Sequence, residues 1–507
     1  MPARPVRTRR SVLSLQPLEG RLAPAGNIVA SVSPLGLLLM TGDVDANDVT
    51  LTVTPTNVTL TGNAGTTVNG SATPAVLGLV KSIKADLQGG NDTLSIDGTA
   101  SFSVAGAVAI TLGDGDNTLN LVTTGKIDLG ALKVKAGDGA DTVNIQGGAG
   151  LGSQVKGAAS FNYANGGSST NFTEMRFGVG VTVIATDAVG IPNEVIGTNT
   201  TVVKVVSATL GNSVPSVVHF IDSAIGGLKE TGNSVLAILQ STQVTGSINL
   251  KGVFQADLQV EAATVTGSVA LTAPNPNFSA DGAGSTINGN LLLNGSLGWN
   301  LVQFQSTTVT EVKGNVTVLG GWFNDQFTTN GNFKVGKNLT FTLNGGDNIV
   351  ELGDGTAAVT IGGNLKYKGG AGADSITLNR VTLTGLTATT GSTLIQTLAG
   401  NDTLTIDNAS TFTRTFTADL GSGNDSITMG QVIGAPAPVT FSGTAKILAG
   451  TGDDSLFLGL DAGFGGDANS RVVFSGAGSV VDGGDGIDFF DPTSGQFSGV
   501  TPIGWNP

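Results

Sequence analysis

A unit of strand and turn recurs along this chain about every 24 residues. One form of the unit reads apolar-x-Gly-x-apolar-x-apolar. Its clearest copies start at Val244, Val265, Ile287, Val312 and Ile361. A second form is a Gly/Asp turn that leads into an alternating strand, as in GGNDTLSI. Repeats of this length are typical of solenoids, in which one unit buries its apolar face only by stacking on its neighbours.

The repeat predicts an all-β chain that forms a single parallel β-helix, with about 24 residues per coil and a right-handed turn by the usual crossover preference. Long proline-free stretches, 75–191 and 277–435, fit this fold because proline cannot donate to a ladder of strands. A row of β-sandwich domains would also show regular strands, but it does not readily explain the spacing of the Gly/Asp turns.

We expect four segments. Residues 1–26 form a targeting or processing segment, 27–80 a β-rich starter or cap, 81–490 the parallel β-helix, and 491–507 a C-terminal tail. The pattern is weak between residues 170 and 240, so the repeat does not define the fold of that stretch. A cap is expected because an open solenoid end exposes unpaired strand edges.

Composition narrows the classes of function. The formal net charge is −14. Residues 1–26 contain five arginines and one glutamate, so the rest of the chain has a net charge of −18. A body this acidic repels nucleic-acid phosphates and attracts cations, so we expect no nucleic-acid partner. There is no cysteine, and the single His219 lies in an apolar strand, where we expect a structural role. No apolar run approaches the ~20 residues of a transmembrane helix.

The N-terminal segment carries a short motif. Leu18-Glu19-Gly20-Arg21 resembles the Leu-Glu-x-Arg motif near the N-terminus of many planctomycete cell-envelope proteins, although Gly20 stands where that motif often has proline. The resemblance covers about eight residues and implies export to the cell surface or the extracellular space. The other interpretation of this segment is a disordered basic tail.

The Gly/Asp turns resemble the calcium-binding nonapeptide of the repeats-in-toxin family, G-G-x-G-x-D-x-U-x, in which U is a large apolar residue. Two segments, 369–377 and 483–491, match it in full, and other turns match in part. The glycines allow positive φ and expose carbonyl groups, while aspartate supplies a hard anionic oxygen. The resemblance therefore implies Ca²⁺ as a cofactor, with these candidate ligands: Asp92, Asp141, Asp374, Asp402, Asp425, Asp454, Asp485 and Asp488.

One departure from that family leaves an alternative open. Its repeats are contiguous, whereas this chain has one Gly/Asp turn in about 24 residues, so only one edge of the solenoid could hold sites. Asn117 also replaces the acid in one copy. The alternative is that these Asp and Asn residues only shape turns and form side-chain ladders.

These features favour a non-catalytic secreted or cell-surface protein, such as a spacer, a matrix component or an adhesin, with polysaccharide or other envelope components as partners. The competing class is a β-helix carbohydrate-active enzyme, either a polysaccharide lyase or a hydrolase, which rests on an analogy of fold. Its groove would need clustered acids and a base. A third option, a threonine-rich face that binds ice or mineral, needs a flat exposed array of threonines.

Overall fold

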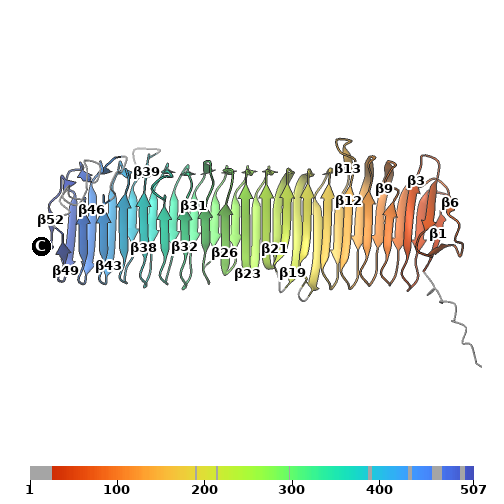
Figure 1. Cartoon of the computed structure of the whole chain (residues 1–507), viewed down its shortest axis with the longest axis horizontal. Helices are drawn as coiled ribbons and strands as arrows, with labels where there is room; N and C mark the ends of the chain where they lie inside the picture. The colour runs from red at the N-terminus through yellow and green to blue at the C-terminus, as the bar shows by residue number, and fades with distance from the viewer. Residues whose placement is uncertain are drawn as a thin grey trace, which may run out of the picture.

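The computed structural model describes residues 26–188, 191–212, 215–295, 297–385, 391–431, 437–459, 471–491 and 497–506. Every regular element within these ranges is a β-strand. The strands stack along one long axis into a β-solenoid of about 15 turns, about 25 residues apart (Figure 1). The predicted all-β parallel solenoid is confirmed, with a coil close to the expected length.

A coil contributes up to three strands, one to each of three faces, which we call A, B and C in chain order. In one coil these strands are β27 (Thr286–Ile287), β28 (Leu291–Asn294) and β29 (Leu301–Phe304). Each pairs in parallel with the equivalent strand of the next coil, so that β27 pairs with β30, β28 with β31 and β29 with β32.

Face A contains the shortest strands. They are β13 (Ser153–Val155), β16 (Met175–Phe177), β22 (Gln243–Val244), β24 (Thr264–Val265), β27, β30 (Thr310–Val312), β33 (Phe333–Val335), β36 (Val359–Ile361), β39 (Val381–Leu383), β42 (Thr411–Phe412), β45 (Val439–Phe441), β48 (Val472–Phe474) and β51 (Phe497–Ser498).

Face B contains strands that in the first half of the stack often continue from face A. They are β2 (Leu37–Thr41), β7 (Ser82–Asp86), β9 (Phe102–Thr111), β11 (Ile127–Lys135), β14 (Ala159–Tyr163), β17 (Val181–Ala188), β19 (Thr201–Asn212), β21 (Ala224–Gln240), β23 (Ile248–Glu261), β25 (Val269–Thr272), β28, β31 (Val316–Leu319), β34 (Leu339–Thr342), β37 (Leu365–Lys368), β40 (Thr393–Gln396), β43 (Phe416–Ser422), β46 (Ala445–Thr451), β49 (Val480–Asp485) and β52 (Pro502–Ile503).

Face C contains the strands that follow the Gly/Asp turns, together with the last halves of β21 and β23. Its other strands are β3 (Asp48–Val53), β8 (Thr93–Ile96), β10 (Thr118–Val122), β12 (Asp141–Gln146), β15 (Ser168–Thr173), β18 (Asn193–Thr198), β20 (Ser216–Ile221), β26 (Asn275–Ala280), β29, β32 (Gln326–Thr329), β35 (Ile349–Leu352), β38 (Ser375–Asn379), β41 (Thr403–Asp407), β44 (Ser426–Met429), β47 (Ser455–Leu458) and β50 (Phe489–Phe490).

The two ends of the stack differ. At the start, β1 (Asn27–Val32) pairs antiparallel with β2, and β4 (Val58–Gly62) pairs antiparallel with β3 and β6 (Ala75–Leu77), while β5 (Thr67–Val68) lies parallel to β1. Antiparallel hairpins therefore cover this end, as a cap should. At the other end, β51 and β52 pair in parallel with β48 and β49. Residues 497–506, which we expected in a tail, continue the stack.

The middle of the stack has shorter coils and longer strands. Paired residues are 24 positions apart at Thr118↔Thr142 but 19 apart at Ser216↔Val235. The 17-residue β21 passes through all three faces, because it pairs with β22 on face A and with β23 on faces B and C. The described residues between 170 and 240, a stretch whose fold the repeat left undefined, therefore belong to the same solenoid.

The interior is a continuous apolar column. Inward residues alternate with outward ones along each strand, as period-2 patterning predicts. Equivalent inward residues stack between coils: the rings of Phe412, Phe441 and Phe474 lie face to face, with centroid distances of 5.1 and 4.8 Å. Burial of these side chains, roughly 1.5–3 kcal/mol each, is the main stabilising term.

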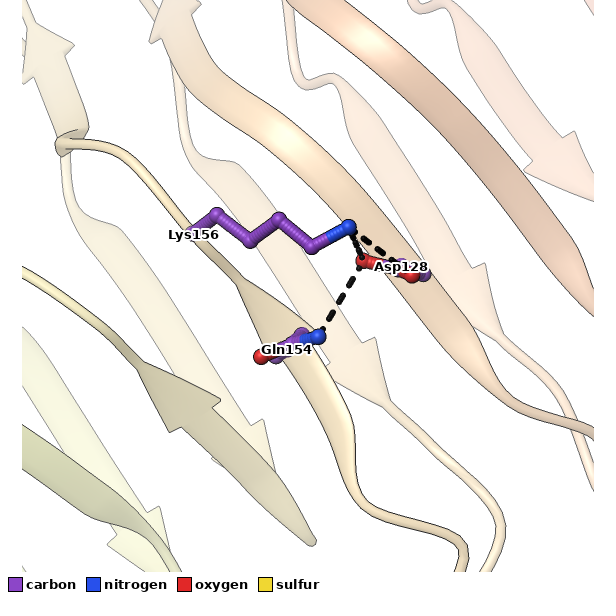
Figure 2. A network of polar contacts seen from close by, with 3 residues as sticks. All are labelled: Asp128, Gln154 and Lys156. Atoms are coloured by element: carbon purple, nitrogen blue, oxygen red, sulfur yellow. Dashed lines mark hydrogen bonds and ion pairs between the residues drawn. The ribbon is translucent and has the colours of Figure 1, made fainter.

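Ion pairs contribute little to the stack. In the described part of the chain there are two, Lys156–Asp128 and Lys334–Glu311, each 2.8 Å long and each between neighbouring coils of face A. Figure 2 shows the first, in which Gln154 also donates to Asp128 over 3.4 Å. Both lysine side chains are about half exposed, and such surface pairs are typically worth about 0–1 kcal/mol.

Candidate functional site

The turn between faces B and C gathers the acidic residues of the repeat, and we call it the acidic corner. Its defining position is the residue directly before or at the start of each face C strand. Eight aspartates occupy this position, and each is at most 2% exposed: Asp92, Asp141, Asp325, Asp374, Asp402, Asp425, Asp454 and Asp488.

Seven of the eight candidate ligands chosen from the sequence lie in this row. Asp485 does not, because it is exposed and lies three residues before Asp488. The row also contains Asp325, which the sequence reasoning missed. In GGWFNDQF, Phe323 replaces the third glycine of the nonapeptide. The signal that remained was Asn-Asp followed by a polar and then an apolar residue.

An inner ladder of hydrogen bonds connects the row along the solenoid axis. One carboxylate oxygen of each aspartate accepts the backbone N–H of the equivalent residue in the preceding coil. The N–H of Asp374 donates to Oδ1 of Asp402, that of Asp402 to Asp425, and that of Asp425 to Asp454, each over 2.7 Å. This contact satisfies a buried backbone donor that the turn would otherwise leave unpaired.

An outer ladder is formed by the residues one position before the inner aspartates. Its direction is opposite, because each side-chain oxygen accepts the backbone N–H of the following coil. The side-chain oxygen of Asn401 accepts the N–H of Asn424, and that of Asn424 accepts the N–H of Asp453, over 2.8 and 3.0 Å. These residues are exposed. The ladders predicted as the structural alternative are therefore present, and they account for one oxygen of each inner aspartate.

Asparagine at the inner position shows what the second side-chain atom needs. In Asn117 the oxygen accepts the N–H of Asp92, as in the aspartates. Its amide nitrogen donates to the carbonyl groups of Gly113 and Gly115 and to Oδ1 of Asp141, over 3.2, 2.9 and 3.0 Å. The amide nitrogen of Asn348 makes two equivalent contacts, because it donates to the carbonyl of Gly346 and to Oδ1 of Asp374. The carbonyl groups of the turn and the next carboxylate thus provide acceptors for a hydrogen-bond donor at this side-chain position.

In the eight aspartates the atom that corresponds to this donor is Oδ2, which is an acceptor. It is buried and makes no hydrogen bond of normal geometry in any of them, although the hydroxyl groups of Tyr367 and Thr397 lie near enough to Asp374 and Asp402 to offset part of the rise in the pKa of these two carboxyl groups. A buried carboxylate oxygen without a partner is strongly unfavourable, so these positions favour a proton, an ordered water molecule or a cation beside Oδ2.

The pKa values reflect this environment. Burial raises the pKa of Asp141 and of Asp425 to about 7, and that of Asp92 and of Asp374 to about 6. The charges of Asp402 and Asp454 on either side raise the pKa of Asp425 further. At pH 7 without a cation, Asp141 and Asp425 are therefore about half protonated, whereas Asp92 and Asp374 are mostly ionised.

Glycine stands two residues before the inner aspartate in every one of these turns except that of Asp325, where Phe323 takes this place. Gly423 and Gly452 both have φ near +136°, which disfavours other residues. A Cβ atom on Gly452 would lie 1.9 Å from the carbonyl oxygen of Gly423 in the preceding coil. The carbonyl groups of successive turns therefore line the same corner as the carboxylates.

The row of acids is interrupted in the middle of the stack. Register places Val235, Ala256 and Pro276 at the inner position of three successive coils, where β21 and β23 continue through the corner. The acids thus form two groups, one around Asp92 and Asp141 and one from Asp325 to Asp488. The second group includes four neighbouring Asp–Asp steps, from Asp374 to Asp488, as expected from the sequence.

No protein-family model, curated protein or solved structure matches this chain. Within the described residues no three His, Cys, Asp or Glu side chains gather in a way that could hold a metal ion, and no helix is long and apolar enough to cross a membrane. A cation at the acidic corner would accordingly be held by one or two carboxylates together with backbone carbonyl groups. Such an oxygen-only set suits Ca²⁺.

His219 lies away from this corner. It is on the outer side of β20 and half-buried, and its Nε2 is 3.1 Å from Oε1 of Gln240 in the next coil. Gln240 in turn donates to Glu261 over 3.2 Å. The histidine is therefore part of a ladder of polar side chains across face C.

Proposed function

We propose that this chain is a non-catalytic secreted or cell-surface β-solenoid, which serves as a rigid spacer, matrix component or adhesin and is stabilised by calcium at its acidic corner. The observation that supports it best is the row of eight buried Oδ2 atoms without a partner. A catalytic site is needed once in a chain. The buried, unpaired carboxylate oxygen recurs in many coils, as expected for sites that bind a structural ion.

Calcium fits the corner better than other common cations. The available donors are carboxylate and carbonyl oxygens, which are hard ligands, and the chain has no cysteine and only one histidine. Magnesium demands a near-ideal octahedron and gives up its water reluctantly, so it should substitute poorly. A cation between neighbouring coils would also relieve the repulsion among successive carboxylates.

Arginine placement supports the non-catalytic assignment. Arg176 lies in β16 on face A, Arg380 and Arg471 directly precede β39 and β48 on the same face, and Arg414 lies between β42 and β43. A polysaccharide lyase needs a base and a cation that act together in one groove. These four arginines are distributed over separate coils.

The alternative is a carbohydrate-active hydrolase, and one place on face C favours it. Glu261 ends β23, and Asp281 follows β26 in the next coil, so the two carboxylates are neighbours across the ladder. Many glycosidases use such a carboxylate pair. Release of reducing ends from a polysaccharide that is lost in both Glu261→Gln and Asp281→Asn would support this alternative and overturn the non-catalytic proposal.

Calcium titration of the purified chain at pH 8 tests the proposal. We expect several sites per chain in the range typical of extracellular modules, about 10⁻⁴–10⁻³ M, with little heat on addition of Mg²⁺. Absence of binding at millimolar Ca²⁺ would mean that the corner accommodates its ionised carboxyl groups without calcium. In that case the acidic corner would be purely structural.

Location is tested separately. Fractionation of the native cells should find the chain at the cell surface or in the medium, where envelope polysaccharide is the expected partner, with residues 1–26 required for export. A cytoplasmic pool with an intact N-terminus would contradict this part of the proposal and leave the calcium result unaffected.

A further inference from the structure

Exposed aromatic side chains gather at one corner of the solenoid. Among the described residues, five aromatic side chains are strongly exposed, and four of them lie close together in sequence and register. We call these four the aromatic corner: Phe254, Trp299, Trp322 and Phe323, which are 60%, 45%, 77% and 62% exposed. The fifth is Phe489, near the end of the stack.

Hydrogen bonds place these residues on three of four successive coils, because the coil of Asn275 lies between those of Phe254 and Trp299. The side chain of Asn275 donates to the carbonyl of Phe254 over 3.0 Å, and its oxygen accepts the N–H of Trp299 over 3.2 Å. The next residue, Asn300, donates from its backbone to Asp325, so Trp322 and Phe323 lie one coil further on. At about 4.8 Å per coil, the aromatic corner extends roughly 15 Å along the axis.

The turn itself does not require these aromatic residues. In the following coil Gly345 lies next to Trp322, and Gly346 is stacked on Phe323. Glycine therefore suffices at the same corner where this coil has two large apolar side chains. Exposed apolar clusters that the fold does not use mark interaction surfaces.

A shallow groove of about 330 Å³ lies beside the aromatic corner on face C. Leu301 lines it two residues after Trp299, and Asp257, Gln259, Asn277 and Gln303 supply polar groups from three coils. Asp257 is fixed, because it accepts hydrogen bonds from Gln255 over 2.7 Å and from Asn277 over 2.9 Å. A smaller hollow with Gln240, Gln259 and Glu261 continues it toward the N-terminal end.

Charge defines what this groove can hold. The strands of face C contain no lysine or arginine within the described residues, while the groove contains the carboxyl groups of Asp257 and Asp281. An anionic polymer would be repelled there. Amide and carboxyl groups beside aromatic rings are suited to an uncharged ligand that has many hydroxyl groups and apolar ring faces.

We propose that the aromatic corner and the adjoining groove bind a chain of neutral polysaccharide. Sugar rings stack on Trp299 and Trp322, and their hydroxyl groups exchange hydrogen bonds with Asp257, Gln259 and Gln303. This site deepens the proposed function, since it gives a surface-located solenoid its glycan partner. It does not depend on calcium or on export, because binding is measured with the purified chain.

Affinity electrophoresis tests the site with two sets of polymers. The neutral set is a β-(1→4)-glucan, a β-(1→4)-mannan and an α-(1→4)-glucan, and the anionic set is pectate and alginate. We expect at least one neutral polymer to retard the chain and neither uronate to do so. Trp299→Ala combined with Trp322→Ala should weaken binding roughly tenfold or more. Phe489→Ala, a matched exposed aromatic elsewhere, should bind like the parent.

Three results would overturn the proposal. They are no retardation by any neutral polymer, equal binding by the tryptophan variant, and preferential binding of a uronate. Light scattering must also show that the parent is not a dimer that the tryptophan variant dissociates, because that result would assign the patch to a second copy. Phe254→Ala tests the same site with an independent substitution. Circular dichroism checks that each variant folds. Failure of this test would leave the calcium titration untouched.

Discussion

At the scale of single residues, the acidic corner is distinguished by one atom, the unpaired Oδ2 of each inner aspartate. Asn117 and Asn348 carry an amide donor at the same place and use it. Both residue types are visible at this position in the sequence, where we interpreted asparagine as a copy of the calcium motif that lacks the acid. The contacts indicate instead that, without a cation, these two asparagines are better satisfied than the aspartates, whereas Asn47, Asn193 and Asn300 at the same position each leave one side-chain atom without a partner.

Asp425→Asn is therefore expected to have opposite effects with and without calcium. In chelator at pH 8 the variant should be more stable by about 1–3 kcal/mol, because the amide can donate where Oδ2 has no partner and a charge between Asp402 and Asp454 is removed. In millimolar Ca²⁺ the variant should gain less stability than the parent. Urea unfolding in both buffers measures this.

Asn348→Asp is the matched control and should behave in reverse, with lower stability in chelator and a larger response to calcium. If both substitutions change stability equally in the two buffers, the corner does not bind calcium.

Glu230 is a buried acid outside the corner, on face B. It points into the core from β21 between Ala208 and Leu250, is fully buried, and neither carboxylate oxygen has a partner. Burial raises its pKa well above the ordinary value. We expect Glu230→Leu to raise the free energy of unfolding by about 1–3 kcal/mol in urea at pH 8.

The sign of the pH effect follows from the raised pKa. The fold favours protonated Glu230. Its contribution to the free energy of unfolding is therefore complete at pH values below its pKa in the unfolded chain, and it is lost as pH rises through its pKa in the folded chain. The gain from Glu230→Leu should therefore be smaller at pH 4 than at pH 8, and Glu230→Gln should gain less than leucine. A leucine variant that is less stable than the parent at pH 8 would show that other contacts stabilise this acid in the core.

At the scale of elements, the Gly/Asp turn depends on close approach between coils. Gly452→Ala combines positive φ with a contact of 1.9 Å to the carbonyl of Gly423, so neighbouring coils must separate. Gly478→Ala has a smaller positive φ of 75°, close to values that several other residues of this chain adopt, and open space around the new Cβ. We expect Gly452→Ala to cost clearly more than Gly478→Ala, whose cost should be about 1–3 kcal/mol. Equal losses of stability in thermal melts would contradict stacked turns.

The turns also explain how much of the structure the sequence could predict. Glycine and aspartate at fixed spacing predicted the parallel solenoid and placed seven of the eight inner aspartates. Residues 170–240 were left undefined because β21 crosses the corner as a continuous strand, with Val235 in place of a turn residue. The aromatic corner could not be predicted, since exposure of Trp299 and Trp322 depends on which residues the register brings to one edge.

At the scale of the whole molecule, the raised pKa values of the inner aspartates from Asp92 to Asp454 add up to a pH dependence. Each raised pKa favours the protonated fold, so without calcium this contribution to stability is complete below the unfolded pKa of about 3.9 and is lost as pH rises from there through the folded pKa values of about 6–7. Each group contributes about 1.4 kcal/mol for each unit of pKa shift. Metal-free protein should therefore melt at a lower temperature at pH 8 than at pH 5.

The melting temperature at pH 5 and pH 8, in millimolar Ca²⁺ and in chelator, tests the calcium-stabilised corner most directly. Calcium bound only by the folded chain stabilises it by about 2.7 kcal/mol per site at a hundredfold excess over Kd. We predict that calcium raises the melting temperature strongly at pH 8, where the carboxyl groups ionise, and weakly at pH 5, where protons compete. A melting temperature at pH 8 that is the same in calcium and in chelator would contradict this account.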